Sequence, residues 1–318
     1  MRSVAARLLE VAVAVAVAFP ALASAQNTQS FVASTGDDTA ACTRGAPCRN
    51  IQAALGKTVA GGEVDCLDAA DYGVMTITQA ITIQCTTLGS VTAPSGITAV
   101  TIQAGANDAI HLSGLAIEAQ GAGQYGIRIN SAGSVTIEHC VISGFNLGYS
   151  GGFGNGYGIF DQNSTPTKLL VTDTVLAKNG TGVFILPSSA SRISLIHVLI
   201  MANAYYGVQA SSEATSAPVH LTISDSVISQ NVNDGIEVQS EDGTGPISAV
   251  IAGTTITDNT MGLLVSGSNA SASISSSVVT NNLAFGLEGA GSTLVSYANN
   301  MIADNGAGSG VFTTAPLQ

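Results

Sequence analysis

The sequence has no tryptophan, few aromatic residues (5%) and little charge (9% Asp, Glu, Lys and Arg) in its 318 residues. Basic residues are the scarcest charged type, with 9 Lys and Arg against 21 Asp and Glu and a formal net charge of −12. Such a chain lacks the basic patch that nucleic acids and anionic lipids require, so neither is expected as a partner. The 46% hydrophobic content excludes intrinsic disorder, because disordered chains combine low hydrophobicity with high charge.

The first 25 residues are typical of an export signal. Arg2 and Arg7 precede an apolar run at 11–22, and Ala-Ser-Ala follows at 23–25. Pro20 interrupts the run, which falls short of the ~20 residues that span a bilayer, so a secretory signal is favoured over a membrane anchor. We expect cleavage after this segment and a secreted or periplasmic protein. No later segment is expected to span a membrane.

All five cysteines follow this signal, and four of them fall within 44 residues, namely Cys42, Cys48, Cys66 and Cys85. Because export leads to an oxidising compartment, we interpret these four as disulfides. Among the three connectivities, ease of local loop closure favours Cys42–Cys48 with Cys66–Cys85. A zinc site is the alternative, but neither CxxC spacing nor a nearby His accompanies the thiols. We expect Cys140 to be a buried free thiol.

One pattern recurs after residue 100: an alternating strand, a small residue, an apolar pair, an Asn, and then a Gly with an aliphatic residue. The recurring asparagines are separated by 24, 28, 28, 23 and 23 residues: Asn179, Asn203, Asn231, Asn259, Asn282 and Asn305. The Val/Ile/Thr runs alternate in twos and show no helical period. A period in the mid-twenties therefore predicts several strands per repeat.

Repeats of this kind form a solenoid, because one turn cannot close its own core and successive turns stack at about 4.8 Å. Equivalent residues then form columns. Two inward aliphatic columns are predicted, one with Ile137, Ile223, Ile251 and Ile274, the other with Ile142, Leu176, Ile200, Ile228, Ile256, Val279 and Ile302. We interpret the asparagines as a structural ladder, in which the side-chain amides satisfy one another and the turn backbone.

With these marks, residues 31–315 resemble the right-handed parallel β-helix repeat proteins of the pectin-lyase-like superfamily. The resemblance implies an all-β fold, a single-stranded right-handed parallel β-helix of about ten coils. Residues 42–55 are similar to the entry segment of such proteins, a disulfide loop followed by a short capping helix with its apolar face on the first coil. The predicted organisation is a signal peptide at 1–25, an N-terminal disulfide loop and capping segment at 26–72, and the β-helix at 73–318.

Two columns beside the glycine marks point outward by strand alternation and predict a glycan-binding face. Aromatic rings next to carboxylates and one Arg suit a glycan, whose C–H faces stack on rings while its hydroxyls bond to polar neighbours. We expect contacts with a polysaccharide or cell-surface glycan from Tyr125, Arg128, Tyr157, Phe160, Phe184, Tyr206, Gln209 and Glu237. The alternative is an ordinary strand face with scattered exposed apolar groups.

Another column lies at the bend before the small inward residue and contains His139, Asp173, His197 and Asp225 on adjacent coils. Alternating imidazole and carboxylate groups at strand spacing predict a divalent-metal or proton-linked site, and a divalent metal is the one cofactor that we consider. The alternative is a row of turn-forming polar residues, because bends favour Asp and Asn for local backbone reasons.

Two pairs of carboxylates on the predicted glycan-binding face are catalytic candidates: Asp234 with Glu237, and Glu237 with Glu288. A glycosidase needs two carboxylates about 5–9 Å apart. However, the coils lack the Asn-Thr-Asp, Gly-His-Gly and Arg-Ile-Lys signatures of polygalacturonase-like relatives, and no Lys or Arg lies within a carboxylate cluster. We therefore favour non-catalytic binding or structuring of extracellular polysaccharide, with a polysaccharide lyase or glycoside hydrolase on the same face as the alternative.

Overall fold

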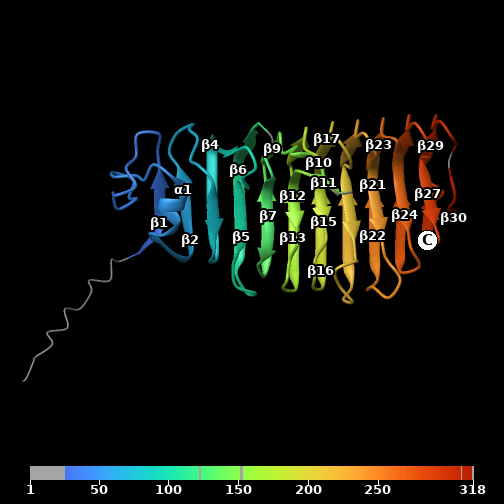
Figure 1. Ribbon diagram of the computed structural model, residues 1–318, viewed down its shortest axis with the longest axis horizontal. Helices are drawn as coiled ribbons and strands as arrows, with labels where there is room; N and C mark the ends of the chain where they lie inside the picture. The colour runs from blue at the N-terminus through green and yellow to red at the C-terminus, as the bar shows by residue number, and fades with distance from the viewer. Residues whose placement is uncertain (1–25, 122, 151–152, 309, 317–318) are drawn as a thin grey trace, which may run out of the picture.

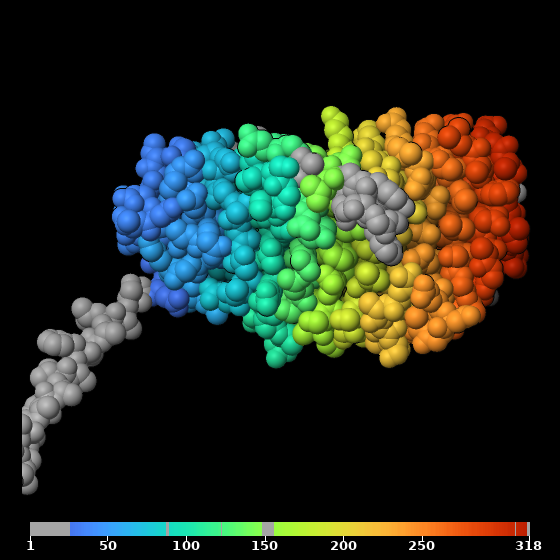
Figure 2. Space-filling view, viewed as in Figure 1, coloured from blue at the N-terminus to red at the C-terminus, as the bar shows by residue number. Residues whose placement is uncertain are grey.

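The computed structural model of the chain describes residues 26–121, 123–150, 153–308 and 310–316, so the expected signal peptide at 1–25 lies outside the described residues. The chain winds as parallel coils that stack along the long axis from the blue N-terminal end to the red C-terminal end (Figure 1). Figure 2 shows the same rod in space-filling form. The expected all-β solenoid is confirmed. Within the described ranges, no helix has the length and apolar character needed to cross a membrane.

One sheet contains nine strands and is called here the nine-stranded sheet. Its strands, in spatial order, are β3 (Met75–Ile77), β5 (Val100–Gln103), β7 (Tyr125–Ser131), β12 (Tyr157–Asp161), β15 (Thr181–Ile185), β18 (Val208–Ser211), β21 (Asp234–Gln239), β24 (Met261–Ser266) and β27 (Leu287–Ala290). The coil count is thus slightly lower than the ten that the repeat predicted.

A nineteen-stranded sheet forms the other walls, with a longer and a shorter strand in most coils. The longer strands are β1 (Asn27–Val32), β2 (Thr58–Cys66), β4 (Ile81–Pro94), β6 (Ala109–Gln120), β8 (Ser134–Glu138), β13 (Thr167–Thr172), β16 (Ser191–Ile196), β19 (Val219–Ser224), β22 (Ile247–Ala252), β25 (Ala270–Ser275) and β28 (Thr293–Tyr297). The shorter strands are β9 (Val141–Ser143), β14 (Val175–Ala177), β17 (Leu199–Met201), β20 (Val227–Ser229), β23 (Thr255–Thr257), β26 (Val278–Thr280), β29 (Met301–Ala303) and β30 (Thr313–Ala315). A separate antiparallel pair joins β10 (Gly148–Ser150) to β11 (Phe153–Asn155).

The strand register places the predicted aliphatic columns inside the coils. Ile142 lies beside Leu176, which lies beside Ile200, and the same register continues through the following short strands. Ile223 and Ile251 are likewise neighbours in the longer strands, and both are fully buried. The core is therefore a set of continuous aliphatic stacks along the axis, in which each coil is stabilised by burial against the next.

The asparagines form a hydrogen-bonded ladder beside the short strands. The backbone N–H of Asn203 donates to Asn231 Oδ1 (3.2 Å), and the backbone N–H of Asn231 donates to Asn259 Oδ1 (3.0 Å). The same bond links each successive pair from Asn179 to Asn305. The ladder satisfies backbone donors that the coil exposes where the chain turns from the short strand toward the nine-stranded sheet.

The recurring glycine after each ladder asparagine is required for close approach between coils. A Cβ at Gly207 would lie 2.5 Å from the carbonyl oxygen of Gly235 and 2.9 Å from Asn231 Nδ2. Real Cβ atoms do not tolerate such contacts with backbone. Only glycine therefore fits where the ladder and the next coil meet.

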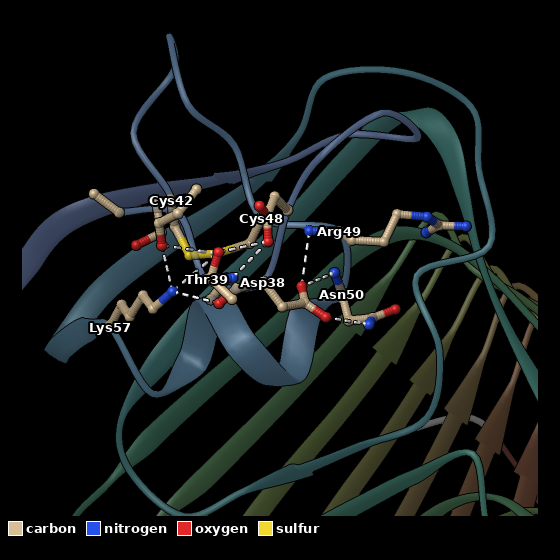
Figure 3. The surroundings of a disulfide bond; sticks show 12 residues. Asp38, Thr39, Cys42, Cys48, Arg49, Asn50 and Lys57 are labelled. Atoms are coloured by element: carbon tan, nitrogen blue, oxygen red, sulfur yellow. Dashed lines mark hydrogen bonds between the residues drawn. A yellow bond between two sulfur atoms is a disulfide. The ribbon is translucent and has the colours of Figure 1, made fainter.

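Both predicted disulfides are present: Cys42–Cys48 closes a loop in the N-terminal segment, and Cys66–Cys85 joins β2 to β4. Figure 3 shows the first bridge beside Asp38, whose carboxylate accepts the backbone N–H groups of Arg49 and Asn50 (both 2.8 Å). Lys57 Nζ donates to the Asp38 carbonyl (2.6 Å). These bonds connect the disulfide loop to the segment that enters the first coil.

The helix expected in this segment is reduced to α1 (Ile51–Leu55), a single five-residue turn, so no clear capping helix is formed. Its three apolar residues, Ile51, Ala54 and Leu55, are buried as the predicted apolar face. Its N-cap residue, Asn50, makes no side-chain capping bond. A helix of this length has little stability of its own, so packing against the first strands holds it.

Candidate functional site

The outward columns of the nine-stranded sheet are contiguous, as strand alternation predicted. Register places Arg128 beside Phe160, Phe160 beside Phe184, and Gln209 beside Glu237. Phe184 lies beside Gln209, so one unbroken row of side chains crosses successive coils. In the neighbouring column, Tyr125 lies beside Tyr157.

Four of these aromatic residues pack on one another and form, with Leu186, an aromatic cluster outside the main core. The Tyr125 and Tyr157 rings stack at 5.5 Å between centroids, and the Phe160 and Phe184 rings stack at 5.3 Å. Tyr157, Phe160 and Phe184 are only 6%, 7% and 4% exposed. Burial raises the pKa of Tyr157 to about 12. These three rings therefore cover one another in the folded protein, and the expected stacking of sugars on them stays a prediction.

Arg128 lies where this cluster meets a polar groove of about 370 Å³. Its guanidinium lies 5.6 Å from the Tyr125 ring centroid, and Arg128 Nη2 donates to Gln162 Oε1 (2.9 Å). Arg128 Nε is buried without a hydrogen-bond partner. The groove is lined chiefly by uncharged hydrogen-bonding side chains, namely Gln103, Asn130, Gln162, Ser164 and Ser188. This composition suits a ligand rich in hydroxyl groups.

Beyond the cluster lie three acidic side chains, which are Glu237 in the same row, Asp234 at the start of the same strand, and Glu213 in the loop after β18. Burial raises the pKa of Asp234 to about 7, and the nearby negative charge of Glu237 adds to the effect. Burial also raises the pKa of Glu237, whereas the hydrogen bond that Gln209 Nε2 donates to Glu237 Oε2 (2.9 Å) lowers it. A carboxyl group whose pKa is raised toward neutrality by burial is suited to act as a general acid.

Glu213 was not found from the sequence, because it lies in the loop after β18 rather than in the periodic strands. It accepts a hydrogen bond from Gln239 Nε2 (2.7 Å), and burial followed by repulsion from Glu241 raises its pKa. Its negative charge also raises the pKa of Glu237. The signal available in the sequence was the longer repeat between Asn203 and Asn231 (28 residues, against 24 in the repeat before it), which contains the extra residues at 211–218. Insertions in a solenoid often gather at its binding face.

The structure separates the second proposed carboxylate pair. Leu264 lies between Glu237 and Glu288 in the row, and Glu288 Oε2 accepts the backbone N–H of Val311 (3.1 Å). Glu288 is thereby bonded to the C-terminal segment. Tyr206 is half-buried in the neighbouring column.

The predicted metal column occupies the bend between the longer and shorter strands. His139, Asp173, His197 and Asp225 have φ values of 52°, 48°, 52° and 49°. Asp, Asn and His tolerate this left-handed conformation better than most residues, and Gly253 occupies the same bend in a later coil. Turn chemistry therefore accounts for the column.

Ligand geometry does not support the metal site either. His197 Nδ1 lies 3.8 Å from Asp173 Oδ1, and both side chains are exposed. In the part of the chain that the structure describes, no three His, Cys, Asp or Glu side chains converge as metal ligands would. The column runs as separate outward groups instead of turning toward a common point.

The comparisons with known proteins agree with this architecture. The sequence matches the family described as the right-handed β-helix region over residues 81–270. No curated protein matches the chain. The fold is similar to the crystal structure of an alginate lyase from Paenibacillus sp., with 13% identity, a TM-score of 0.61, and coverage of 92% of this chain and 100% of that chain.

Two further solved structures have the same fold. A pectate lyase is 13% identical, with a TM-score of 0.56 and coverage of 92% of this chain and 76% of that chain. The Dettilon tailspike protein is 14% identical, with a TM-score of 0.53 and coverage of 90% and 68%. Identities this low show the fold alone, whereas the family match covers more than half of the sequence. This chain belongs to the right-handed β-helix family.

Proposed function

We propose that this protein binds an extracellular polysaccharide across the outer face of the nine-stranded sheet, without cleaving it. The observation that carries the proposal is the polar groove at Arg128, in which a guanidinium lies among amide and hydroxyl side chains. Sugar hydroxyls both donate and accept hydrogen bonds, so they match the mixed donors and acceptors of this lining. The groove lies beside the partly exposed Tyr125 ring, whose edge offers an apolar contact.

The fold and the disulfides support an extracellular role. Two disulfides are stable in oxidising compartments, so export by the predicted signal peptide forms part of the proposal. Two of the structural neighbours are named as lyases of pectate and alginate, which shows that this architecture accommodates polysaccharides in other proteins.

The test measures binding to a panel of neutral and acidic polysaccharides by affinity electrophoresis and calorimetry. We expect Arg128→Gln to weaken binding about tenfold, because it removes charged donors from the groove. Lys178→Gln is the matched control, since it removes one exposed positive charge and Gln230 already occupies the equivalent bend with nearly the same φ (57° against 59°). Equal affinity of both variants would reject the groove as the binding site.

A second function, glycoside hydrolysis or lyase chemistry, is favoured by one observation, the pair Asp234 and Glu237. A protonated Asp234 would act as general acid toward the glycosidic oxygen, and ionised Glu237 would act as base or nucleophile. New reducing ends would indicate hydrolysis, and new unsaturated ends would indicate elimination. Turnover by the wild-type chain that Glu237→Gln abolishes would replace the non-catalytic proposal with this one.

A further inference from the structure

A row of basic side chains crosses three coils. It lies on the strands that follow the turns bordering the Arg128 groove. Lys168 lies beside Arg192 in the strand register, and Arg192 lies beside His220. All three are exposed near the starts of β13, β16 and β19. We call these three residues the basic row.

The concentration of positive charge in this row contrasts with the rest of the coils. After residue 60 the sequence contains only four Lys and Arg residues, and two of them are adjacent members of the row. Adjacent parallel strands are about 4.8 Å apart, so Lys168 and Arg192 start from directly opposite backbone positions. Like charges directly opposite each other on neighbouring strands are destabilising.

Within the part of the chain that the structure describes, no acidic side chain forms an ion pair with the basic row. Among the described residues, ion pairs join His111 to Glu138 and His197 to Asp173, and none involves the basic row. The one hydrogen bond recorded for a side chain of the row links His220 Nδ1 to Ser248 Oγ (2.8 Å). The ammonium of Lys168 and the guanidinium of Arg192 therefore keep their donors for an external anion.

A pocket of about 190 Å³ adjoins these side chains. Its walls include Pro166 and Pro218, which precede β13 and β19 by one residue, and Ala190 lies between them. Proline fixes its own φ, so the turns give the pocket rigid walls. Lys168, Arg192 and His220 all line the pocket, which has room for a single anionic group.

We propose that the basic row and its pocket bind the carboxylates of a linear acidic polysaccharide. One uronate carboxylate lies in the pocket between Lys168 and Arg192, and the rest of the polymer extends along the axis of the solenoid. The row favours an extended ligand, because only such a ligand contacts successive coils simultaneously. This site is separate from the Arg128 groove, and it depends on the proposed function only for the polymer class.

An acidic polysaccharide is favoured over a nucleic acid by the charge of the whole chain. Nucleic acid binding requires neutralisation of many phosphates, and the overall net charge of −12 opposes it. Three basic side chains beside one pocket suit a ligand with sparser charge and bulky uncharged parts between the anions. The test therefore includes an oligonucleotide of matched charge.

The experiment measures binding of labelled galacturonate oligosaccharides by fluorescence anisotropy at low ionic strength, using the mature chain. We expect the trimer and longer oligomers to bind more tightly than the monomer. We expect Lys168→Gln combined with Arg192→Gln to weaken trimer binding at least about tenfold. Lys178→Gln is the single-charge control and should bind as the wild type does. Circular dichroism checks the fold of each variant, and both substituted side chains of the double variant are exposed.

The outcomes separate this inference from the proposed function. Trimer binding that survives Arg128→Gln and is lost in the double variant supports the basic row. Trimer binding that is lost in Arg128→Gln and retained in the double variant overturns the basic row and keeps the groove. Failure of the wild type to bind the trimer, or equal binding of the matched oligonucleotide, also overturns the inference. If the trimer binds to the basic row and no polysaccharide binds to the Arg128 groove, the proposed function is rejected and the inference about the row is kept.

Discussion

Asp234 and Glu237 lie three residues apart on β21, and the negative charge of Glu237 adds to burial in raising the pKa of Asp234 to about 7. The amide of Gln209, one coil away, donates to Glu237 and favours its charged form. Two carboxyl groups close in sequence therefore differ in environment. Environments that separate the protonation of two carboxyl groups are a feature of acid–base sites.

We predict that Glu237→Gln lowers the pKa of Asp234, because it removes a neighbouring negative charge. NMR titration of side-chain-labelled aspartate measures this pKa directly. Glu288→Gln is the control, since Glu288 lies two strands further along the row and should leave the titration of Asp234 unchanged. An unaltered titration in Glu237→Gln would show that the two groups are not coupled.

The Asn ladder should be sensitive to loss of an inner member. Asn231→Ala removes the oxygen that accepts both the backbone N–H and Nδ2 of Asn203, and leaves buried donors unpaired. We expect a loss of about 2–4 kcal/mol in the free energy of unfolding. Urea denaturation measures it.

Asn305→Ala provides the comparison for this effect. Asn305 is the last member of the ladder and is only partly buried, so its truncation should cost less. Equal losses for the two variants would contradict a cooperative ladder.

Asp161 is a fully buried carboxyl group inside the solenoid. It occupies the inward column between Ile129 and Ile185, and Asp161 Oδ2 has no hydrogen-bond partner. Asp161 Oδ1 accepts the backbone N–H of Asn163 (3.2 Å), but burial dominates and raises the pKa of Asp161 from 3.8 to about 7. The folded state therefore holds a proton that the unfolded state releases at lower pH.

The protonated Asp161 therefore contributes to the free energy of unfolding. This contribution is fully present below the pKa of the unfolded state, 3.8, and is lost as pH rises through about 7. The shift corresponds to about 4 kcal/mol. We predict that Asp161→Asn, which stays neutral, is more stable than the wild type at about pH 8, and that the advantage disappears at about pH 3, below the unfolded pKa of 3.8. Urea unfolding at both pH values measures the difference.

Asp258→Asn is the matched control for this pH dependence. Asp258 is exposed at a bend with φ 58°, and Asn281 occupies the equivalent bend with φ 57°. The control should follow the wild type at both pH values. Asp234 titrates in the same sense as Asp161, so part of the dependence should remain in Asp161→Asn. An identical pH profile for Asp161→Asn and wild type would contradict the buried-carboxyl explanation.

The free thiol of Cys140 should be inert in the native protein. It is 1% exposed, and burial raises its pKa to about 11, so little thiolate forms. We predict that a thiol reagent modifies Cys140 only at the rate of unfolding. Val141→Cys supplies the control, because Val141 is 42% exposed and its replacement should react rapidly. Rapid native labelling of Cys140 would show that the coil opens locally.

The sequence determined the repetitive part of this protein. The regular recurrence of Asn203, Asn231 and Asn259 predicted the solenoid, and strand alternation predicted which residues face inward. Both signals are local, since a period of two along a strand and a fixed repeat length specify register between neighbouring coils. The two disulfides were predictable for the same reason, because each closes a short loop.

Only the tertiary structure decided which outward side chains remain accessible. Alternation placed Phe160 and Phe184 outside, but their stacking across coils buries them. The bend that positions His139 has a left-handed backbone, which residue type alone does not reveal. Glu213 and the two pockets belong to loops and turns, whose paths follow no period and depend on packing against neighbouring coils. The repeat thus specified the solenoid, whereas the contacts between its irregular parts created the sites.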